Sequence, residues 1–296
     1  MIKTLKYLTA LCALLTATLA RAEPELQPNY ATLDWTVAET LIALGVQPAA
    51  IGDVAGYKKW VVKPQLQPDI LDLGLRNQPN AEQVIRLSHN SHTHPLHFIN
   101  SSFYQSAAQT LKPFAMVSTV DFYKEGDAWR NIVTATQQIA RLLGEPERAE
   151  QLLATFNRRI ATLRPQAKPF TDRPIALVQF IDTRHLRIYG VNSPFGEVLR
   201  QLGFTNAWQQ EVNIWGFDTI AVTRLVKLPA DTRFVVVKPY PADIARALTH
   251  NTLWQHLPMS QNALVLPAIW TFGGIPSAQR FAETLLNGLI YGGEPW

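Results

Sequence analysis

The sequence predicts an α/β protein made of two α/β lobes that are joined by a single long helix. Three observations lead to this prediction. Short apolar runs that are typical of strands alternate with longer amphipathic segments that are typical of helices. A charged amphipathic stretch of about 20 residues interrupts this alternation near the middle of the chain. The alternation then starts again and continues to the last helix-like segment.

Residues 1–22 predict a cleavable secretory signal peptide. A cationic head precedes an apolar run over residues 8–19, and Ala20 and Ala22 are small residues two positions apart. The alternative is a membrane anchor, but the run is shorter than the roughly 20 apolar residues that span a bilayer. We therefore expect cleavage after Ala22 and export to the periplasm.

Removal of this segment changes the charge and the cysteine content. The whole chain has 27 Lys and Arg against 23 Asp and Glu. Lys3, Lys6 and Arg21 leave with the signal peptide, so the mature chain has 24 basic against 23 acidic residues. This near balance does not indicate a nucleic-acid-binding surface. Cys12 is the only cysteine, so the mature chain has no disulfide and no thiolate metal ligand.

The segment before residue 144 carries two clear helix signals. The stretch DWTVAETLIALG begins with Asp34 as an acidic cap and ends at Gly45. The apolar run AAIGDV, which follows it, predicts a strand. The stretch DAWRNIVTATQQIARLLG repeats the helix pattern and ends at Gly144.

The stretch EPERAEQLLATFNRRIATLRP predicts the helix that joins the lobes. Pro146 lies in its first turn, where a missing amide hydrogen costs nothing, and Pro165 marks its end. The predicted boundaries are 23–143 for the N-terminal lobe, 144–167 for the linking helix and 168–296 for the C-terminal lobe. Because one continuous helix resists bending, we expect a shallow and largely pre-formed cleft between the lobes.

Strand and helix signals follow in quick succession in the predicted C-terminal lobe. PIALVQFI and LRIYG predict a pair of strands, and PFGEVLRQLGF predicts a helix. RFVVVK and ALVLPA predict two further strands. SAQRFAETLLNGLIYGG predicts the last amphipathic helix.

The sequence lacks the motifs that would indicate an enzyme. It contains no G-x-S-x-G nucleophile elbow, no P-loop, no dinucleotide-binding fingerprint and no H-E-x-x-H zinc motif. Asp121, Glu125 and Asp127 cluster before a predicted helix, where carboxylates favour the helix dipole, so we interpret them as helix-start residues. The chain is therefore predicted to bind a ligand without transforming it.

Several aromatic residues at predicted loops and element ends indicate a ligand-binding cleft. Any one of them could equally fill a core, but their presence in both lobes favours a shared aromatic cleft. Arg76 follows the strand-like run ILDLGL, and its planar guanidinium suits several ligand oxygens at once, although a solvated loop arginine is the alternative. The aromatic residues in question are Trp35, Trp60, Trp208, Trp215 and Trp270.

Four stretches of the chain resemble a known family. They are LDWTVAETLIALGVQP, YKKWVVKPQLQPDILDLGLRNQPNAEQV, FIDTRHLRIYGVNSPFGEVLRQLGFTNAWQQEVNIWG and LPAIWTFGG. They are similar to the periplasmic iron(III)-hydroxamate (ferrichrome-type) siderophore-binding proteins, the FhuD type, of the helix-linked class of substrate-binding proteins for ABC importers. The resemblance implies a monomer without a covalent cofactor, which captures a ferric siderophore between its lobes. An inner-membrane ABC permease with its ATPase would receive the ligand.

The resemblance also implies which residues bind the ligand. Arg76 would donate to the hydroxamate oxygens around the ferric ion, and Tyr104 would be its hydrogen-bond partner, with the adjacent Phe103 as an alternative. Because a hexadentate siderophore already satisfies its iron, the protein would supply apolar walls and a few donors but no metal ligand. The remaining implied cleft residues are Trp35, Trp60, Tyr189, Trp208, Asn213, Trp215, Trp270 and Phe272.

Three positions depart from the pattern of that family. Arg187, in LRIYG, stands where an apolar residue is usual, which suggests a more anionic or more polar ligand than neutral ferrichrome. Phe272 stands where a tyrosine is common. Permease docking in this class uses one acidic residue on each lobe, and Glu82 fits the first lobe. In the second lobe Thr223 occupies the usual place, so Glu197 is the substitute, and each glutamate is otherwise a solvated helix charge.

The stretch SHNSHTHPLH admits two interpretations. Its four histidines have a spacing that would suit a metal ion, but no carboxylate or cysteine lies among them to complete a ligand set. We therefore interpret the stretch as a solvated polar loop before the strand LHFIN, with a zinc or manganese site as the alternative. Cobalamin, haem or a catecholate siderophore are alternative ligands of the same fold, and a siderophore esterase is a further alternative. The histidines are His89, His92, His94 and His97.

Overall fold

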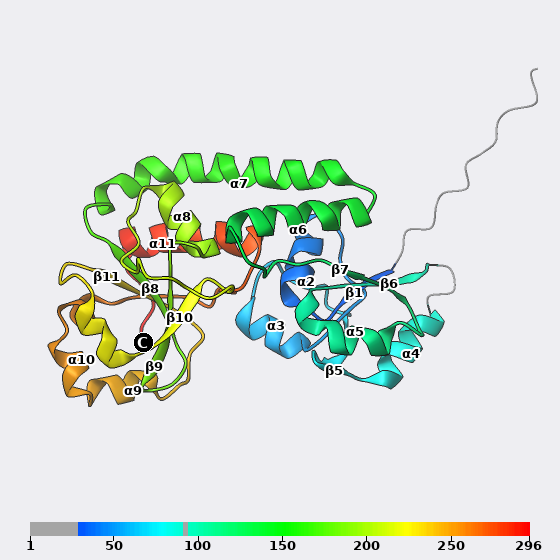
Figure 1. The fold of residues 1–296 in the computed structure, drawn as a ribbon, viewed down its shortest axis with the longest axis horizontal. Helices are drawn as coiled ribbons and strands as arrows, with labels where there is room; N and C mark the ends of the chain where they lie inside the picture. Colours follow the sequence, from blue (N-terminus) through cyan, green and yellow to red (C-terminus); the bar gives the residue numbers. More distant parts are fainter. Residues whose placement is uncertain (1–28, 91–93) are drawn as a thin grey trace, which may run out of the picture.

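The computed structural model describes residues 29–90 and 94–296, and these residues form two five-stranded sheets beneath one long helix (Figure 1). The predicted signal peptide, residues 1–22, lies outside the described residues. Within the described part of the chain, no helix is long and apolar enough to cross a membrane. The first sheet uses strands that precede the long helix, and the second uses strands that follow it.

The first sheet is parallel throughout and has the order β3-β2-β1-β6-β7. From β1 the chain winds to β2 and β3 on one side and then returns to β6 and β7 on the other. The carboxyl ends of β1 and β6 therefore meet where the winding direction reverses, which is the place where open α/β sheets bind ligands. The strands are β1 (Asn29–Thr32), β2 (Ala50–Ile51), β3 (Leu71–Asp72), β6 (Leu96–Asn100) and β7 (Met116–Thr119).

Of the helices around this sheet, α2 starts where the sequence predicts, whereas α3, α4 and α5 were not predicted. Asp34 caps α2, because its carboxylate accepts from the amide of Thr36 at 2.8 Å. The predicted strand AAIGDV is shorter than expected, because Asp53 takes a left-handed conformation and caps α3. The elements are α2 (Trp35–Ala43), α3 (Val54–Trp60), α4 (Ala81–Asn90), α5 (Gln105–Leu111), the 3-10 turn η1 (Ser102–Tyr104) and the hairpin of β4 (Gly74–Leu75) and β5 (Gln78–Pro79).

The second sheet is mixed and has the order β10-β9-β8-β11-β12. The predicted strand pair is an antiparallel hairpin of β8 (Ile175–Phe180) and β9 (His185–Tyr189). Strand β10 (Phe217–Ala221) is antiparallel to β9, whereas β11 (Arg233–Val237) and β12 (Leu264–Leu266) run parallel to β8. The remaining elements are α8 (Pro194–Leu202), α9 (Ile244–Thr249), α10 (Thr252–His256), α11 (Ile275–Tyr291), η3 (Val222–Lys227) and η4 (Pro258–Asn262).

The long helix α7 (Pro146–Ala167) runs above both sheets and is preceded by α6 (Ala128–Leu142) (Figure 1). It has 22 residues and continues past Pro165, where the sequence placed its end. Proline in the last turn removes only one amide donor, and its fixed φ is compatible with a helix, so the turn is completed before η2 (Lys168–Phe170) begins. The lobe boundaries themselves stay a prediction.

One hydrophobic core connects the two halves of the molecule. It contains buried side chains from α2, such as Val37 and Leu41, together with Leu177 of β8. Phe195 of α8 and Phe281 of α11 stack within it, with ring centroids 4.3 Å apart. Helices α6, α8 and α11 all pack against α7 around this core. The halves therefore share an interior in addition to the helix that joins them.

A buried carboxyl group fastens α2 to α11. Glu39 has no exposed surface, and its two oxygens accept from the amide of Gly274 and from the hydroxyl of Ser277, each at 2.5 Å. These donors lie at the start of α11, so Glu39 caps a helix from the other half of the molecule. Burial outweighs these bonds and raises the pKa of Glu39 to about 8.

Candidate ligand-binding site

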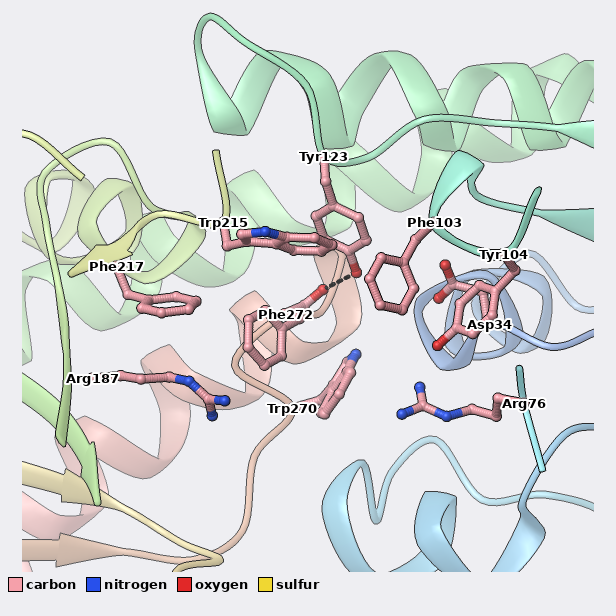
Figure 2. Close-up of a pocket in the computed structure, with 10 residues that line it drawn as sticks. All are labelled: Asp34, Arg76, Phe103, Tyr104, Tyr123, Arg187, Trp215, Phe217, Trp270 and Phe272. Carbon is pink, nitrogen blue, oxygen red and sulfur yellow. Dashed lines mark hydrogen bonds between the residues drawn. The ribbon is translucent and has the colours of Figure 1, made fainter. Parts of the chain in front are cut away.

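A pocket of about 300 Å³ lies between the two halves of the molecule (Figure 2). On the side of the first sheet, its residues come from the segments that follow β1, β6 and β7 and from the β4–β5 hairpin. Six of the predicted site residues line it, namely Arg76, Tyr104, Arg187, Trp215, Trp270 and Phe272. Phe103, the predicted alternative to Tyr104, also lines it, and three lining residues were not predicted with a binding role, namely Asp34, Tyr123 and Phe217.

Arg76 occupies the turn of the β4–β5 hairpin and lies flat on an aromatic platform. Its guanidinium carbon is 3.6 Å from the centre of the Trp35 ring system. The Trp35 indole is buried and donates to the Gly52 carbonyl at 2.9 Å. A Cβ at Gly52 would lie only 3.0 Å from the Arg76 side chain, so this close approach needs glycine. Trp35 therefore supports Arg76 from beneath and does not itself line the pocket.

Asp34 places a carboxyl group at the same end of the pocket. It follows β1 directly, and the hydroxyl of Ser101 and the amide of Thr36 donate to it. Burial raises the pKa of Asp34, while the bonds from Ser101 and Thr36 and the charge of Arg76 act in the opposite direction. The sequence identified Asp34 only as a helix cap, because that role accounts for an acidic residue at this position.

Both Phe103 and Tyr104 line the pocket, so the two residues that the sequence offered as alternatives are both present there. Tyr104 is almost completely buried, and the Arg76 guanidinium carbon is 5.7 Å from its ring centre. Burial raises the pKa of Tyr104, so its phenol stays protonated at neutral pH and can donate a hydrogen bond. Phe103 is 58% exposed and meets Trp215 edge to face at 5.4 Å, which gives the pocket an apolar rim.

Trp215 reaches from the second half of the chain to residues of the first half. Its ring centroid is 4.4 Å from that of Tyr123 and 5.9 Å from that of Phe272. Asn213, predicted to touch the ligand, instead holds this turn, because its side-chain oxygen accepts from the Trp215 amide at 2.9 Å. Asn213 is exposed and lies outside the pocket lining.

Hydrogen bonds fix the segment that carries Trp270 and Phe272 to the first half of the molecule. Tyr123 donates to the Phe272 carbonyl at 2.7 Å, which is the dashed line in Figure 2. The Thr36 hydroxyl donates to the same carbonyl at 3.0 Å and accepts from the Trp270 indole at 2.9 Å. No local sequence pattern reveals these contacts, because Tyr123 and Phe272 are 149 positions apart.

Arg187 lies at the opposite end of the pocket from Arg76 (Figure 2). Its guanidinium carbon is 5.1 Å from the Phe217 ring centre and 5.2 Å from that of Phe272. One terminal nitrogen donates to the side-chain oxygen of Gln179 at 3.2 Å. The sequence singled out Arg187 by its type and position, and the structure places it in the pocket.

Three other predicted residues do not line the pocket. Trp60 packs edge to face against Trp270, with ring centroids 6.4 Å apart, and Tyr189 is fully buried beside Gln179. Trp208 lies in the core behind the second sheet. Element ends suggested a cleft position for Trp60 and Trp208, and the family resemblance suggested one for Tyr189, but Trp208 and Tyr189 are buried and Trp60 is partly covered by Trp270.

The histidine stretch divides between a helix and a strand. His89 ends α4, His94 precedes β6, and His92 lies outside the described residues. His97 is buried in β6, where its Nε2 is 2.8 Å from the Ser118 hydroxyl and burial lowers its pKa, so it is not the solvated loop residue that the sequence predicted. Among the residues with described positions, no group of three or more His, Cys, Asp or Glu is placed to hold a metal ion.

The two candidate docking glutamates differ in their surroundings. Glu82 is exposed in the first turn of α4. Glu197, in the first turn of α8, is largely covered and accepts from Arg200 and Gln201. Burial opposes ionisation of Glu197, but these bonds outweigh it and lower its pKa. Helix α8 packs against α7, whereas α4 shares a hydrophobic cluster with strands of the first sheet and lies away from α7 (Figure 1).

Comparison with known proteins identifies the family. The chain matches the periplasmic binding protein family over residues 31–265. It is 30% identical over 270 residues to the iron(3+)-hydroxamate-binding protein FhuD of Escherichia coli, covering 89% of this chain and 88% of that protein. The crystal structure of FhuD from Vibrio cholerae with bound Fe3+-Desferal superposes with a TM-score of 0.81 at 23% identity, over 90% of this chain and all of that one.

A further solved structure has the same fold at greater distance. FhuD2 of Staphylococcus aureus with bound ferrioxamine B superposes with a TM-score of 0.68 at 16% identity, over 90% of this chain and all of that one. The predicted fold class is thereby confirmed. The family consists of substrate-binding proteins and not of enzymes, as the absence of catalytic motifs predicted. The chain belongs to the periplasmic binding protein family and, within it, to the FhuD-like proteins.

Proposed function

We propose that this protein captures a ferric hydroxamate siderophore in the periplasm and delivers it to an inner-membrane ABC permease. The observation that carries the proposal is the Arg76 end of the pocket. A guanidinium fixed on Trp35 lies beside the protonated phenol of Tyr104, in a pocket whose other walls are mainly aromatic. The relatives support the same ligand class, because Desferal and ferrioxamine B are both hydroxamates.

The chemistry of such a ligand suits these residues. A ferric trihydroxamate has its iron fully coordinated, so the protein meets only the outer face of the complex. The hydroxamate oxygens on this face carry partial negative charge and accept hydrogen bonds. The planar fork of Arg76 can donate to two of them, and Tyr104 can donate to a third. The apolar arms of the siderophore would lie against Trp215, Trp270 and Phe272.

The pocket is small enough that it would enclose only part of a siderophore. Its volume of about 300 Å³ is at the lower end of the range for small-molecule pockets. A siderophore would therefore project beyond its rim, where Phe103 is already exposed. An exposed part of the ligand is accessible to a permease that docks over the opening. We propose Glu82 as the docking acid of the first half. Glu197 would serve in the second half only after exchanging its bonds from Arg200 and Gln201 for bonds to the permease.

Tryptophan fluorescence tests the ligand class directly. The mature chain, residues 23–296, is titrated with ferrichrome and ferrioxamine B, and in parallel with haem, cobalamin, a ferric catecholate, Zn²⁺ and Mn²⁺. A ferric siderophore absorbs near the emission of tryptophan, so binding next to Trp215 and Trp270 should quench it strongly and saturably. Metal-free desferrioxamine B is the control and should produce little change. Saturable binding of haem, cobalamin or a bare ion, without binding of either ferric hydroxamate, would overturn the proposal.

A further inference from the structure

The Arg187 end of the pocket is built differently from the Arg76 end, and the difference concerns charge. Arg187 lies in β9, where its partners across the sheet are Gln179 of β8 and Thr219 of β10. Neither partner is acidic. Among the residues that the structure describes, no carboxylate forms an ion pair with Arg187. Its positive charge is therefore not neutralised from within the pocket.

The side-chain oxygen of Gln179, to which Arg187 donates, is shared with other donors. The side-chain oxygen of Gln179 accepts from Arg187 at 3.2 Å, and from the hydroxyls of Tyr189 and Thr271 at 3.4 Å each. The amide nitrogen of Gln179 donates to the Pro239 carbonyl at 3.2 Å, which fixes the orientation of the amide group. One neutral oxygen cannot satisfy five N–H donors of a guanidinium in addition to two hydroxyls.

The N–H groups of Arg187 from which Gln179 does not accept have partly apolar surroundings. Its Nε is buried and has no hydrogen-bond partner among the described residues. Phe217 and Phe272 lie close to the guanidinium and exclude water from part of it. A buried donor without an acceptor is costly, and an ionic acceptor from the ligand at the terminal nitrogens would add the favourable interaction that the neutral Gln179 does not supply.

Arg187 lies away from the Arg76 end of the pocket, where the ferric centre is proposed to bind. Figure 2 shows Trp270 and Phe272 between the two arginines, so a compact ferric centre held at Arg76 meets rings before it meets Arg187. Arg187 would thus contact a peripheral group of the ligand. The group that best matches a planar guanidinium is a carboxylate, which accepts two parallel hydrogen bonds.

We propose that Arg187 forms an anion subsite for a carboxylate at the periphery of the ferric hydroxamate ligand, so that the preferred ligands are anionic. This inference rests on the proposed function. Arg187 would then select among siderophores by their charge. A ligand with a cationic arm is disfavoured at the same place, because it would bring a second positive charge next to Arg187 in a pocket of low dielectric constant.

Three derivatives of one siderophore test the subsite without changing the iron centre. Ferrioxamine B carries a terminal amine and is cationic, its N-acetyl derivative is neutral, and its N-succinyl derivative ends in a carboxylate and is anionic. We expect the wild type to bind the succinyl form roughly tenfold to a hundredfold more tightly than the acetyl form, and the cationic form most weakly. The preference should shrink when the salt concentration rises.

Two variants assign the preference to the residue. Arg187→Leu should bring the affinities for the succinyl and acetyl forms to within about threefold of each other. Arg187→Gln serves the same purpose should the leucine variant unfold. Arg184→Leu is the matched control, because it removes an exposed arginine from the same β-hairpin outside the pocket, and it should retain the wild-type order.

The possible outcomes separate this inference from the proposed function. Equal wild-type affinities for the succinyl and acetyl forms overturn the anion subsite, whatever the variants show. A preference for the succinyl form that survives in a folded Arg187 variant assigns it to another residue and also overturns the subsite. Failure of the wild type to bind any of the three ferric ligands overturns the proposed function instead.

Discussion

The two ends of the pocket use the same residue type in unlike surroundings. Arg76 lies on the face of Trp35, near the carboxyl group of Asp34 and the phenol of Tyr104. Arg187 lies close to two phenylalanine rings, and its recorded partners, the Gln179 amide and the Tyr189 phenol, are neutral. At the Arg76 end the protein itself supplies a carboxyl group near the guanidinium. At the Arg187 end it supplies only neutral partners, so a negative charge would have to come from the ligand.

This contrast shows that the recognition role of an arginine depends on its neighbours. A guanidinium that already has a carboxyl group nearby gains little from a full negative charge, and it suits the dispersed charge of a neutral ferric complex. A guanidinium with only neutral neighbours gains most from an ion. Two of the four predictions below, for Arg76 and Trp215, test the pocket, and the other two test the contact between its halves and the histidine stretch; the largest expected effect comes first.

Removal of Arg76 should cause the largest loss of ligand affinity. Arg76→Ala should weaken binding of ferrioxamine B by roughly 1.5–3 kcal/mol, the range for a hydrogen bond to a charged group. The fold should survive, because Arg76 lies in a hairpin turn at the surface of Trp35. Arg86→Ala, which removes an exposed arginine of α4, is the control. Fluorescence titration measures both, and equal affinities of the two variants would show that Arg76 is not the anchor.

The buried carboxyl group of Glu39, which links α2 to α11, should make the stability of the protein depend on pH. The folded-state pKa of about 8 lies above the usual value of 4.5, so the folded state holds a proton that the unfolded state loses. The stabilisation is therefore fully present below about pH 4.5 and is lost as the pH rises through 8. Between pH 6 and pH 8 the free energy of unfolding should fall by about 2 kcal/mol on account of this group.

Glu39→Gln tests that assignment with a side chain of the same shape. Glutamine can still accept from Gly274 and can donate to Ser277, but it does not titrate. Urea unfolding between pH 5 and pH 9 should give a flatter profile for the variant than for the wild type. Parallel profiles would mean that Glu39 is ionised throughout this range and that another group titrates.

Trp215 should contribute less than Arg76, because its contact with the ligand is apolar. Trp215→Ala should cost about 1 kcal/mol of affinity, the range for an aromatic contact, and should remove part of the ligand-induced quenching. Trp208→Phe also removes one indole, but from the core of the second half. It should leave the affinity unchanged. If the two variants bind alike, Trp215 does not cover the ligand.

The histidines should have the smallest effect. Replacing His89, His92 and His94 together with serine should leave the affinity for ferric hydroxamates within a few-fold, because neither His89 nor His94 lines the pocket and the stretch supplies no carboxylate for an ion site. Calorimetry with Zn²⁺ supplies the opposing measurement. Tight zinc binding by the wild type that the triple variant loses, without siderophore binding by either, would restore the ion site as the function of this stretch.

Site residues could be predicted where their role depends on neighbours in the sequence, and they were missed where it depends on residues distant in the sequence. Arg76 could be found because a loop after the strand-like run ILDLGL is a local pattern that the family shares, and Asp34 was found as a cap from an equally local pattern. The second role of Asp34 depends on Ser101 and Arg76, which are distant in sequence, so it was missed. Tyr189 was misplaced because it shares its strand face with Arg187, and only the packing of Phe195 and Phe217 shows which of the two stays accessible.

The fold was predictable to a similar degree. Long amphipathic helices such as α6, α7 and α11 carry several turns of pattern and were identified from the sequence. The short helices α9 and α10 have six and five residues, which is too little for a period to emerge. The order of strands in each sheet depends on contacts between distant segments, and the sequence alone did not provide it.

The interior shared by the two halves determines how the protein melts. A fragment that ended before α7 would expose Val37, Leu41 and Ile139 to water, so neither half has a complete core by itself. Heat should therefore unfold both sheets in one cooperative transition, with equal calorimetric and van't Hoff enthalpies. A ligand bound between the halves would raise that single melting temperature instead of splitting the curve. In this respect a protein with two sheets behaves as one thermodynamic unit.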